Sequence, residues 1–280
     1  MVKRAQRRRR GGAEDGDAAP FDPAGILKDW WDAVAVAAAA LAGAPLRLCG
    51  IKTAKLERGQ LAASARGFPL VGLALGLAAA LVYSLATGLG LPPLIASLLA
   101  VATLAFLGGA VFEGGLARVA DALIAGGSKT QNLARLKEEA LGAYGTMVLV
   151  ICLGLRVGAL ASLENPGAVT AALAAALSLS WAAVAVVLYT LPPARRSGFA
   201  HQAGRPALDQ TVLAALLAAA LALLVLGPVA TVAALAIGGL GAAKFAWFAK
   251  RNFGGTTGDV LGAVQQGAEI GVLLAIVALA

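Results

Sequence analysis

The sequence predicts an all-α, polytopic membrane protein with about seven transmembrane helices plus a short amino-terminal helix that is interfacial or re-entrant. Composition is the first reason. Of the 280 residues, 59% are hydrophobic and only 14% are charged, whereas a soluble domain carries roughly a quarter charged residues. The second reason is a series of uncharged runs, each long enough to cross ~30 Å of hydrocarbon as a helix. Together they exclude an ordinary soluble enzyme, a disordered chain and a disulfide scaffold.

The expected spans are set by runs without charged residues. Residues 67–112 contain no Asp, Glu, Lys or Arg, and the turn at 88–93 divides them into two spans of about twenty residues each. Five further spans are expected near 141–163, 168–191, 209–226, 229–248 and 260–280.

The amino terminus differs from the rest of the chain. Residues 1–25 contain six of the 23 Lys and Arg residues and are interpreted as a basic disordered tail, while 26–280 are expected to form one integral membrane domain. Much of the net charge of +8 lies in this tail, so the charge does not indicate a nucleic-acid partner. A helix is expected from Pro23 to Leu41, and its adjacent tryptophans at 30 and 31 suit a membrane–water interface.

The connections between the spans alternate in charge. The turns at 88–93, 164–167 and 227–228 contain no Lys or Arg, whereas the other connections are longer and rich in cations. With seven spans, every cation-rich connection falls on one side, which the positive-inside bias makes cytoplasmic. We therefore expect a protein of the bacterial cytoplasmic membrane, with its amino terminus inside and its carboxyl terminus outside.

The polar groups that could carry chemistry gather on this predicted cytoplasmic face. The chain has only Cys49, Cys152 and His201 as soft ligands, without a CxxC pair, so the parts of a thiol redox centre or a zinc site are missing. Carboxylates with Lys and Arg suit Mg²⁺ and phosphates. A solvated loop surface has a similar composition, so composition alone leaves both interpretations open.

A first candidate segment spans residues 108–121, where a span is expected to leave the membrane. Its glycines permit the close approach of a backbone or a ligand. Glu113 and Asp121 are eight residues apart, which is about 80° around an ideal helix, so both can face one site.

Two further segments enter later spans. Residues 136–145 carry Glu138 and Glu139. These acids either belong to the site or only mark a solvated helix end. Residues 254–263 combine glycines and threonine hydroxyls with Asp259 at the start of a helix. Such a segment can hold a phosphate at the helix amino end, with the acid reaching a metal. The alternative is that Asp259 is only a helix cap.

In combination, these segments resemble the cobalamin (5′-phosphate) synthase family over about residues 45–280. The family's Gly-Gly-x-Thr-Gly-Asp-x-x-Gly-Ala, followed by Glu, matches 254–263 and Glu269. Its Phe-Pro-Leu-Val-Gly element matches 68–72, and a Pro-x-Ala-Arg-x-x-Gly-like stretch lies at 192–198.

The family's acidic motif, His-x-Asp-Gly-Leu-Ala-Asp-x-x-Asp-Gly, is only partly present. Phe112, Gly114 and Arg118 stand at the positions of its histidine and first two aspartates, and Asp121 keeps the third. The family's Asp-Ser-Arg-x-Gly is replaced by residues 138–142, of which the last is the glycine, and the following Tyr-Gly pair is kept at 144–145. Either the remaining acids rebuild a metal site with Arg118 contacting phosphate, or the metal site is lost.

The resemblance implies a Mg²⁺-dependent adenosylcobinamide-GDP ribazoletransferase with a transferase-like domain at 26–280. In this reaction α-ribazole or its 5′-phosphate attacks the phosphodiester of adenosylcobinamide-GDP and releases GMP, in the last steps of cobalamin biosynthesis. The two substrates and the lipid bilayer are the expected partners; no nucleic acid is expected, and an oligomer is left open. The expected Mg²⁺ ligands, of which the first three are also expected to be catalytic, are Asp121, Glu113, Asp259 and Glu138. The expected substrate-binding residues are Arg118, Lys137, Arg195, Gly255, Thr257 and Glu269.

Two alternatives remain open. The replaced motif acids favour a catalytically impaired relative that binds a corrinoid or assists the pathway. A small-solute transporter is the other, because Arg156, Lys244 and Glu269 lie within expected spans and intramembrane charges mark transport pathways. The acids and glycines cluster at one face, however, and not at the midplane where transporters bind. Snorkelling, or pairing with carboxylates inside the bundle, explains Arg156 and Lys244 more simply.

Overall fold

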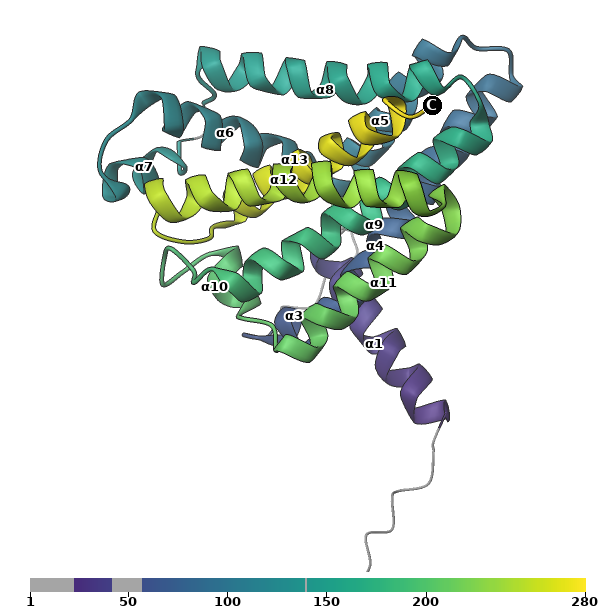
Figure 1. The fold of residues 1–280 in the computed structure, drawn as a ribbon. Helices are drawn as coiled ribbons and strands as arrows, with labels where there is room; N and C mark the ends of the chain where they lie inside the picture. The colour runs from purple at the N-terminus through teal and green to yellow at the C-terminus, as the bar shows by residue number, and fades with distance from the viewer. Residues whose placement is uncertain (1–22, 42–56, 139) are drawn as a thin grey trace, which may run out of the picture.

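The structure, a computed structural model, describes residues 23–41, 57–138 and 140–280. The basic tail up to residue 22, Cys49 and Glu139 lie outside these residues, and what was expected of them stays a prediction. The described chain is a bundle of helices, and its only β-type pairing in these ranges is an isolated bridge between Pro193 and Thr256 (Figure 1).

The helices follow the expected order along the chain. The long ones are α1 Pro23–Leu41, α4 Phe68–Gly88, α5 Pro93–Gly108, α6 Val111–Ala125, α8 Ala143–Leu163, α9 Pro166–Thr190, α11 Leu208–Leu226, α12 Pro228–Asn252 and α13 Gly258–Val277. Short helices occupy the connections: α3 Gln60–Ala63, the 3₁₀ helix η1 Ala65–Gly67, α7 Lys129–Arg135 and α10 Phe199–Ala203.

The expected fold class, a polytopic helical membrane protein, is confirmed. Within the described ranges, six helices are long and apolar enough to cross a membrane, namely α4, α8, α9, α11, α12 and α13. The pair α5 and α6 gives a seventh span if both are counted together. Helix α1 begins at Pro23 and ends at Leu41 as expected, while its place at a membrane interface stays a prediction.

One expected span is interrupted in the structure. The uncharged run to residue 112 predicted a continuous second span, but α5 ends at Gly108 and the chain bends by 88° before α6. The cause lies at Gly109 and Ala110, whose φ angles of 65° and 52° are in the left-handed region that ends a helix. Glu113 therefore lies in the first turn of α6, and its side chain is buried in the bundle.

Helices α9 and α13 form the centre of the bundle. In their most apolar windows 83% and 78% of the residues are buried, against 17% in α8. Helix α13 approaches α6 closely because both carry glycine at the crossing. A Cβ atom at Gly115 would lie 2.9 Å from the Cα of Asp259, and one at Gly262 would lie 2.9 Å from the Cα of Phe112. Small residues allow such contacts between membrane helices, and they fix α6 against the start of α13.

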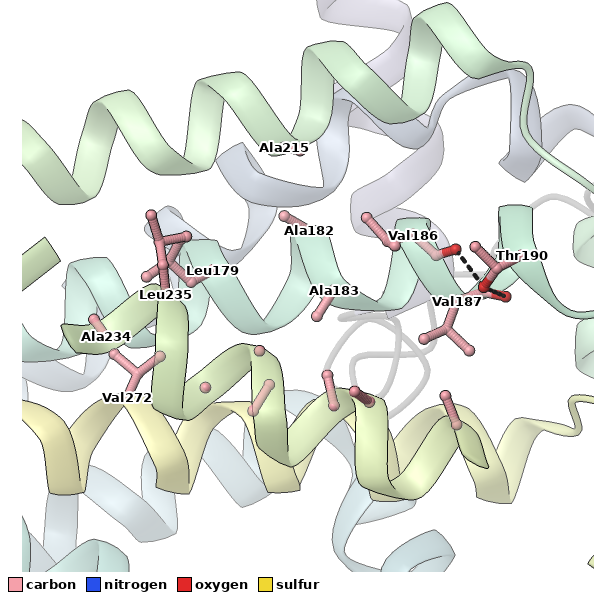
Figure 2. Close-up of a pocket in the computed structure, with 16 residues that line it drawn as sticks. Leu179, Ala182, Ala183, Val186, Val187, Thr190, Ala215, Ala234, Leu235 and Val272 are labelled. Carbon is pink, nitrogen blue, oxygen red and sulfur yellow. Dashed lines mark hydrogen bonds between the residues drawn. The ribbon is translucent and has the colours of Figure 1, made fainter. Parts of the chain in front are cut away.

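An apolar cavity of about 410 Å³ lies between α9, α12 and α13, as Figure 2 shows. Leu179 and Val186 of α9, Leu235 of α12 and Val272 of α13 line it. Among the described residues that line it, Thr190 has the one polar side chain, and its hydroxyl donates to the carbonyl oxygen of Val186 at 3.0 Å. The cavity therefore offers no free polar group to a reacting phosphate.

Candidate functional site

The three candidate segments meet at one end of the bundle, which we call the charged end (left in Figure 1). It comprises part of α6, the start of α8, the connection after α9 and the start of α13, that is residues 118–121, 138, 140–145, 192–200 and 254–259. Two of these connections pair through their backbones. The N–H of Ala194 donates to the carbonyl of Thr256, and the N–H of Thr256 donates to the carbonyl of Pro192, both at 2.8 Å. This pairing holds the glycine-rich turn before α13 in place.

An ion pair joins α6 to α13 at the charged end. The Nε of Arg118 lies 2.8 Å from the Oδ1 of Asp259, and the two side chains are 29% and 17% exposed. The guanidinium lies beside Gly114, where an added Cβ atom would be in ordinary van der Waals contact with it at 3.5 Å. Asp259 does not provide the cap of α13. That bond comes from the hydroxyl of Thr257, which accepts the N–H of Val260 at 3.2 Å.

Asp121 binds the start of α8 through both carboxylate oxygens. Oδ2 accepts the N–H of Gly142 at 2.7 Å, and Oδ1 accepts the N–H of Gly145 at 2.6 Å. The free N–H groups and the partial positive charge at a helix amino end favour an anion there. Glycine is needed at both positions, because a Cβ atom at either would collide with the carboxylate. Asp121 is thereby held rigidly at the junction of α6 and α8.

Two cavities flank the ion pair. The first, of about 310 Å³, is lined among others by Arg118, Asp121, Arg135, Glu138 and Tyr144. The second, of about 220 Å³, is lined among others by Arg195, Ser197, Phe199, Thr256, Thr257 and Asp259. Each partner of the ion pair therefore faces a different cavity, so the pair is the point where the two cavities come together.

Two other expected substrate-binding residues at the charged end, Arg195 and Gly255, contact backbone carbonyl groups. Arg195 donates to the carbonyl of Leu133, which ties the connection after α9 to α7. Gly255 leaves no room for a side chain beside the carbonyl of Pro192. Lys137 is exposed, next to Glu138 in the sequence.

Two expected site residues, Glu113 and Glu269, lie elsewhere. Both are buried in the bundle interior with Arg156 of α8, whose guanidinium Nη1 lies 3.0 Å from Glu113 and whose Nε lies 2.8 Å from Glu269. Gln265 and Gln266 extend this cluster, with Gln265 donating to Glu269 at 2.8 Å and Arg156 donating to Gln266 at 3.3 Å. We call these five residues the inner cluster. The hypothesis that Arg156 pairs with carboxylates inside the bundle is confirmed.

The four expected Mg²⁺ ligands are not gathered into one group. In the part of the chain that the structure describes, no three His, Cys, Asp or Glu side chains come together as a metal site. Asp121 and Glu138 share the first cavity, Asp259 is paired with Arg118, and Glu113 is paired with Arg156. Mg²⁺ often binds through only one or two carboxylates plus substrate phosphates. Asp121 and Glu138 fit such a site, and Mg²⁺ binding itself stays a prediction.

A sequence model of one family, described as cobalamin-5-phosphate synthase, matches residues 33–277. The chain belongs to this family. Among curated relatives, the adenosylcobinamide-GDP ribazoletransferase of Bradyrhizobium diazoefficiens is 39% identical over 77% of this chain and 83% of its own length. That of Azorhizobium caulinodans is 44% identical over 74% of this chain and 81% of its length, and that of Sinorhizobium medicae is 36% identical over 88% and 96%. No solved structure matches the chain.

Sequence reasoning did not name several residues that line the two cavities. Arg135 lines the first cavity, and Ser197 and Thr256 line the second. Arg135 has no local signal that distinguishes it from a solvated loop residue. Ser197 and Thr256 lie in the segments 192–198 and 254–263, which the sequence had singled out without naming these two side chains as site residues. The inner cluster did leave a signal, because the adjacent amides Gln265 and Gln266 interrupt an otherwise apolar span, and polar residues within membrane spans are costly.

Proposed function

We propose that the protein is an adenosylcobinamide-GDP ribazoletransferase. In the reaction, a hydroxyl oxygen of α-ribazole, or of its 5′-phosphate, forms a bond to the phosphorus that carries cobinamide. The bond from that phosphorus to the GMP oxygen breaks, GMP leaves, and the hydroxyl proton is released. The observation that carries the proposal is the pair of polar cavities that come together at Arg118 and Asp259 in a chain of this family.

The first cavity suits the diphosphate of the nucleotide-activated substrate. Arg118 and Arg135 provide guanidinium groups, which bind phosphate oxygens in a bidentate manner. Asp121 and Glu138 would hold Mg²⁺ against the same phosphates. When bound, this ion would neutralise negative charge on the phosphates. Two cations and two acids in one cavity are the equipment expected for handling a phosphorylated substrate.

The second cavity suits the accepting substrate. The hydroxyls of Ser197, Thr256 and Thr257 can bond to a ribose, and the ring of Phe199 can pack against an aromatic base. Arg195 in the same cavity would bind a 5′-phosphate. The two substrates would then meet at the Arg118–Asp259 pair.

The ion pair supplies the two groups that the transfer needs. The carboxylate of Asp259 can accept the proton of the attacking hydroxyl as a general base. The guanidinium of Arg118 can stabilise the charge of the phosphoryl group in transit. Both groups are already present at 2.8 Å from one another, and substrate entry would replace this contact by contacts to the reacting groups.

We further propose that the charged end faces the bacterial cytoplasm, with the amino terminus inside and the carboxyl terminus outside. The cation-rich connections support this orientation through the positive-inside bias. In the proposed reaction the nucleotide-activated substrate binds at the charged end, so this end must face the compartment that contains that substrate.

The direct test is GMP release by the purified full-length protein in liposomes supplied with adenosylcobinamide-GDP, α-ribazole and Mg²⁺. We expect turnover that heat inactivation abolishes and that Asp259→Asn greatly lowers. Absence of GMP under conditions in which the Azorhizobium relative is active would refute the enzymatic proposal. Corrinoid binding without GMP release would instead favour a catalytically impaired relative.

A further inference from the structure

The inner cluster has no contact with the two cavities of the charged end, yet it links the same helices. One side chain of α8, Arg156, reaches α6 through Glu113 at 3.0 Å and α13 through Glu269 at 2.8 Å. It also donates to Gln266 of α13 at 3.3 Å. Arg156 is only 2% exposed, and its partners are similarly enclosed. The guanidinium is therefore a three-helix junction inside the bundle.

The energetics of this cluster argue against a simple stabilising role. Two carboxyl groups share one guanidinium in a low-dielectric interior, where desolvation offsets most of the Coulombic attraction. The amino end of α6 favours a carboxylate at Glu113, which lies in its first turn. Well-packed apolar side chains would stabilise a bundle at least as well. The best-attested use of a buried polar contact is instead to fix the register of packed helices.

The register that the inner cluster fixes is the one on which the charged end depends. Glu113 shares α6 with Arg118 and Asp121, and Glu269 shares α13 with Asp259. Between the two clusters the helices touch at Gly115 and Gly262, so no flexible side chain separates them there. A slip of one helical residue is about 1.5 Å. Such a slip would separate Arg118 from Asp259, and a misplacement of about 1 Å can lower a rate by ~100-fold.

We propose that Arg156 is a positioning residue of the transferase. From inside the bundle it holds α6 in register with α13, so that Arg118 and Asp121 face Asp259 and the start of α8. It does not touch substrate. This inference rests on the proposed function for its kinetic readout, and a separate structural readout keeps the two distinguishable.

The kinetic test uses Arg156→Lys, which keeps the charge but replaces the planar fork by a single ammonium group. We expect kcat to fall about 10- to 100-fold, while KM for both substrates stays within a factor of about 2. The matched control is Lys244→Met, which removes an exposed cation of another membrane helix, α12, and leaves kcat unchanged. A folded Arg156→Lys protein with the kcat of the wild type would overturn the proposal.

A second variant covers the case in which a single substitution fails to fold. Arg156→Met together with Glu113→Gln and Glu269→Gln removes all three charges and leaves no buried charge unpaired. We expect this variant to yield folded protein by size-exclusion chromatography, with kcat still at least about 10-fold below the wild type. Recovery of wild-type kcat along with folding would reduce Arg156 to a purely structural role and overturn the proposal.

The activity-independent readout is cross-linking across the charged end. Arg118→Cys and Asp259→Cys, introduced with Cys49→Ser and Cys152→Ser, are joined by a short bismaleimide in membranes. We expect efficient cross-linking when Arg156 is present and a several-fold slower reaction with the triple variant. If the rates are equal, helix register does not depend on Arg156. Should the wild type release no GMP, the proposed function fails while this measurement still decides the role of Arg156.

Discussion

The two arginine–carboxylate clusters both join α6 to α13, the inner one through Arg156 of α8, and they differ in their access to water. Arg118 and Asp259 at the charged end are 29% and 17% exposed, whereas Arg156 and Glu269 are 2% and 1% exposed. A partly exposed ion pair contributes little to stability and can exchange its partner for a ligand. An enclosed pair cannot separate without leaving an unpaired charge in the interior. The comparison teaches that the same kinds of side chain can bind a ligand where they are partly exposed and can hold packed helices in register where they are enclosed.

The largest expected effect is a loss of activity when the ion pair at the charged end is changed. Asp259→Asn keeps the shape of the side chain but removes the general base, so we expect kcat to fall about 10²- to 10⁴-fold. The unfolding midpoint in detergent should change little, because this ion pair is partly exposed. Asp209→Asn on the exposed start of α11 is the control and should have wild-type activity. A large loss of stability in Asp259→Asn would contradict the distinction between the clusters.

The next effect concerns stability and the inner cluster. Arg156→Met leaves the carboxylates of Glu113 and Glu269 buried without their cation, which should lower the free energy of unfolding by about 3–5 kcal/mol. Chemical unfolding of the purified protein in mixed micelles measures this loss. Removing both carboxylates in the same protein should recover much of it. If the single variant is as stable as the wild type, the inner cluster must admit water, and its contrast with the charged end disappears.

A third substitution disturbs the contact that both clusters share. Gly262→Ala places a Cβ atom 2.9 Å from the Cα of Phe112, and overpacking of this kind costs about 1–3 kcal/mol. Because α6 must shift, GMP release should fall as well. Gly158→Ala in α8 is the matched control, since nothing lies within 4 Å of its added methyl and alanine favours a helix by up to ~1 kcal/mol. Equal effects of the two substitutions would show that the α6–α13 contact is not tight.

The smallest effect is the stability change of Arg118→Met. The pair it breaks is partly exposed, so the free energy of unfolding should fall by less than about 1 kcal/mol. Its effect should instead appear in the kinetics of GMP release, as a lower kcat together with a raised KM for the diphosphate substrate. A stability loss as large as that of Arg156→Met would mean that both clusters are structural.

Most of the fold could be predicted from the sequence because a helix that spans a membrane needs about twenty apolar residues, which appear as an uncharged run. Lys and Arg are excluded from such runs and gather in the connections. It did not predict the break before α6, since Gly109 and Ala110 lie in an uncharged run that is equally compatible with a continuous helix. The break lies in the left-handed backbone of these two residues, which an uncharged run does not encode.

The candidate site was predicted in part for a similar reason. Glycines beside Asp121 and Asp259 correctly indicated segments that meet at the charged end. Glu113 was grouped with Asp121 because the two share a helix face, but eight residues also separate them by about 12 Å along the axis. The two side chains share a face of α6 but lie at different depths in the bundle. The partners of Arg156 come from distant parts of the chain, which no local pattern encodes.

The shortness of α5 has a consequence for how the protein sits among lipids. Its 16 residues extend only about 24 Å, less than the ~30 Å of an average hydrocarbon core. A helix of this length favours a locally thinner bilayer, because hydrophobic mismatch costs free energy for each ångström. Bilayer thickness is therefore an experimental variable for this protein, and GMP release in liposomes of short-chain and long-chain lipids measures its effect.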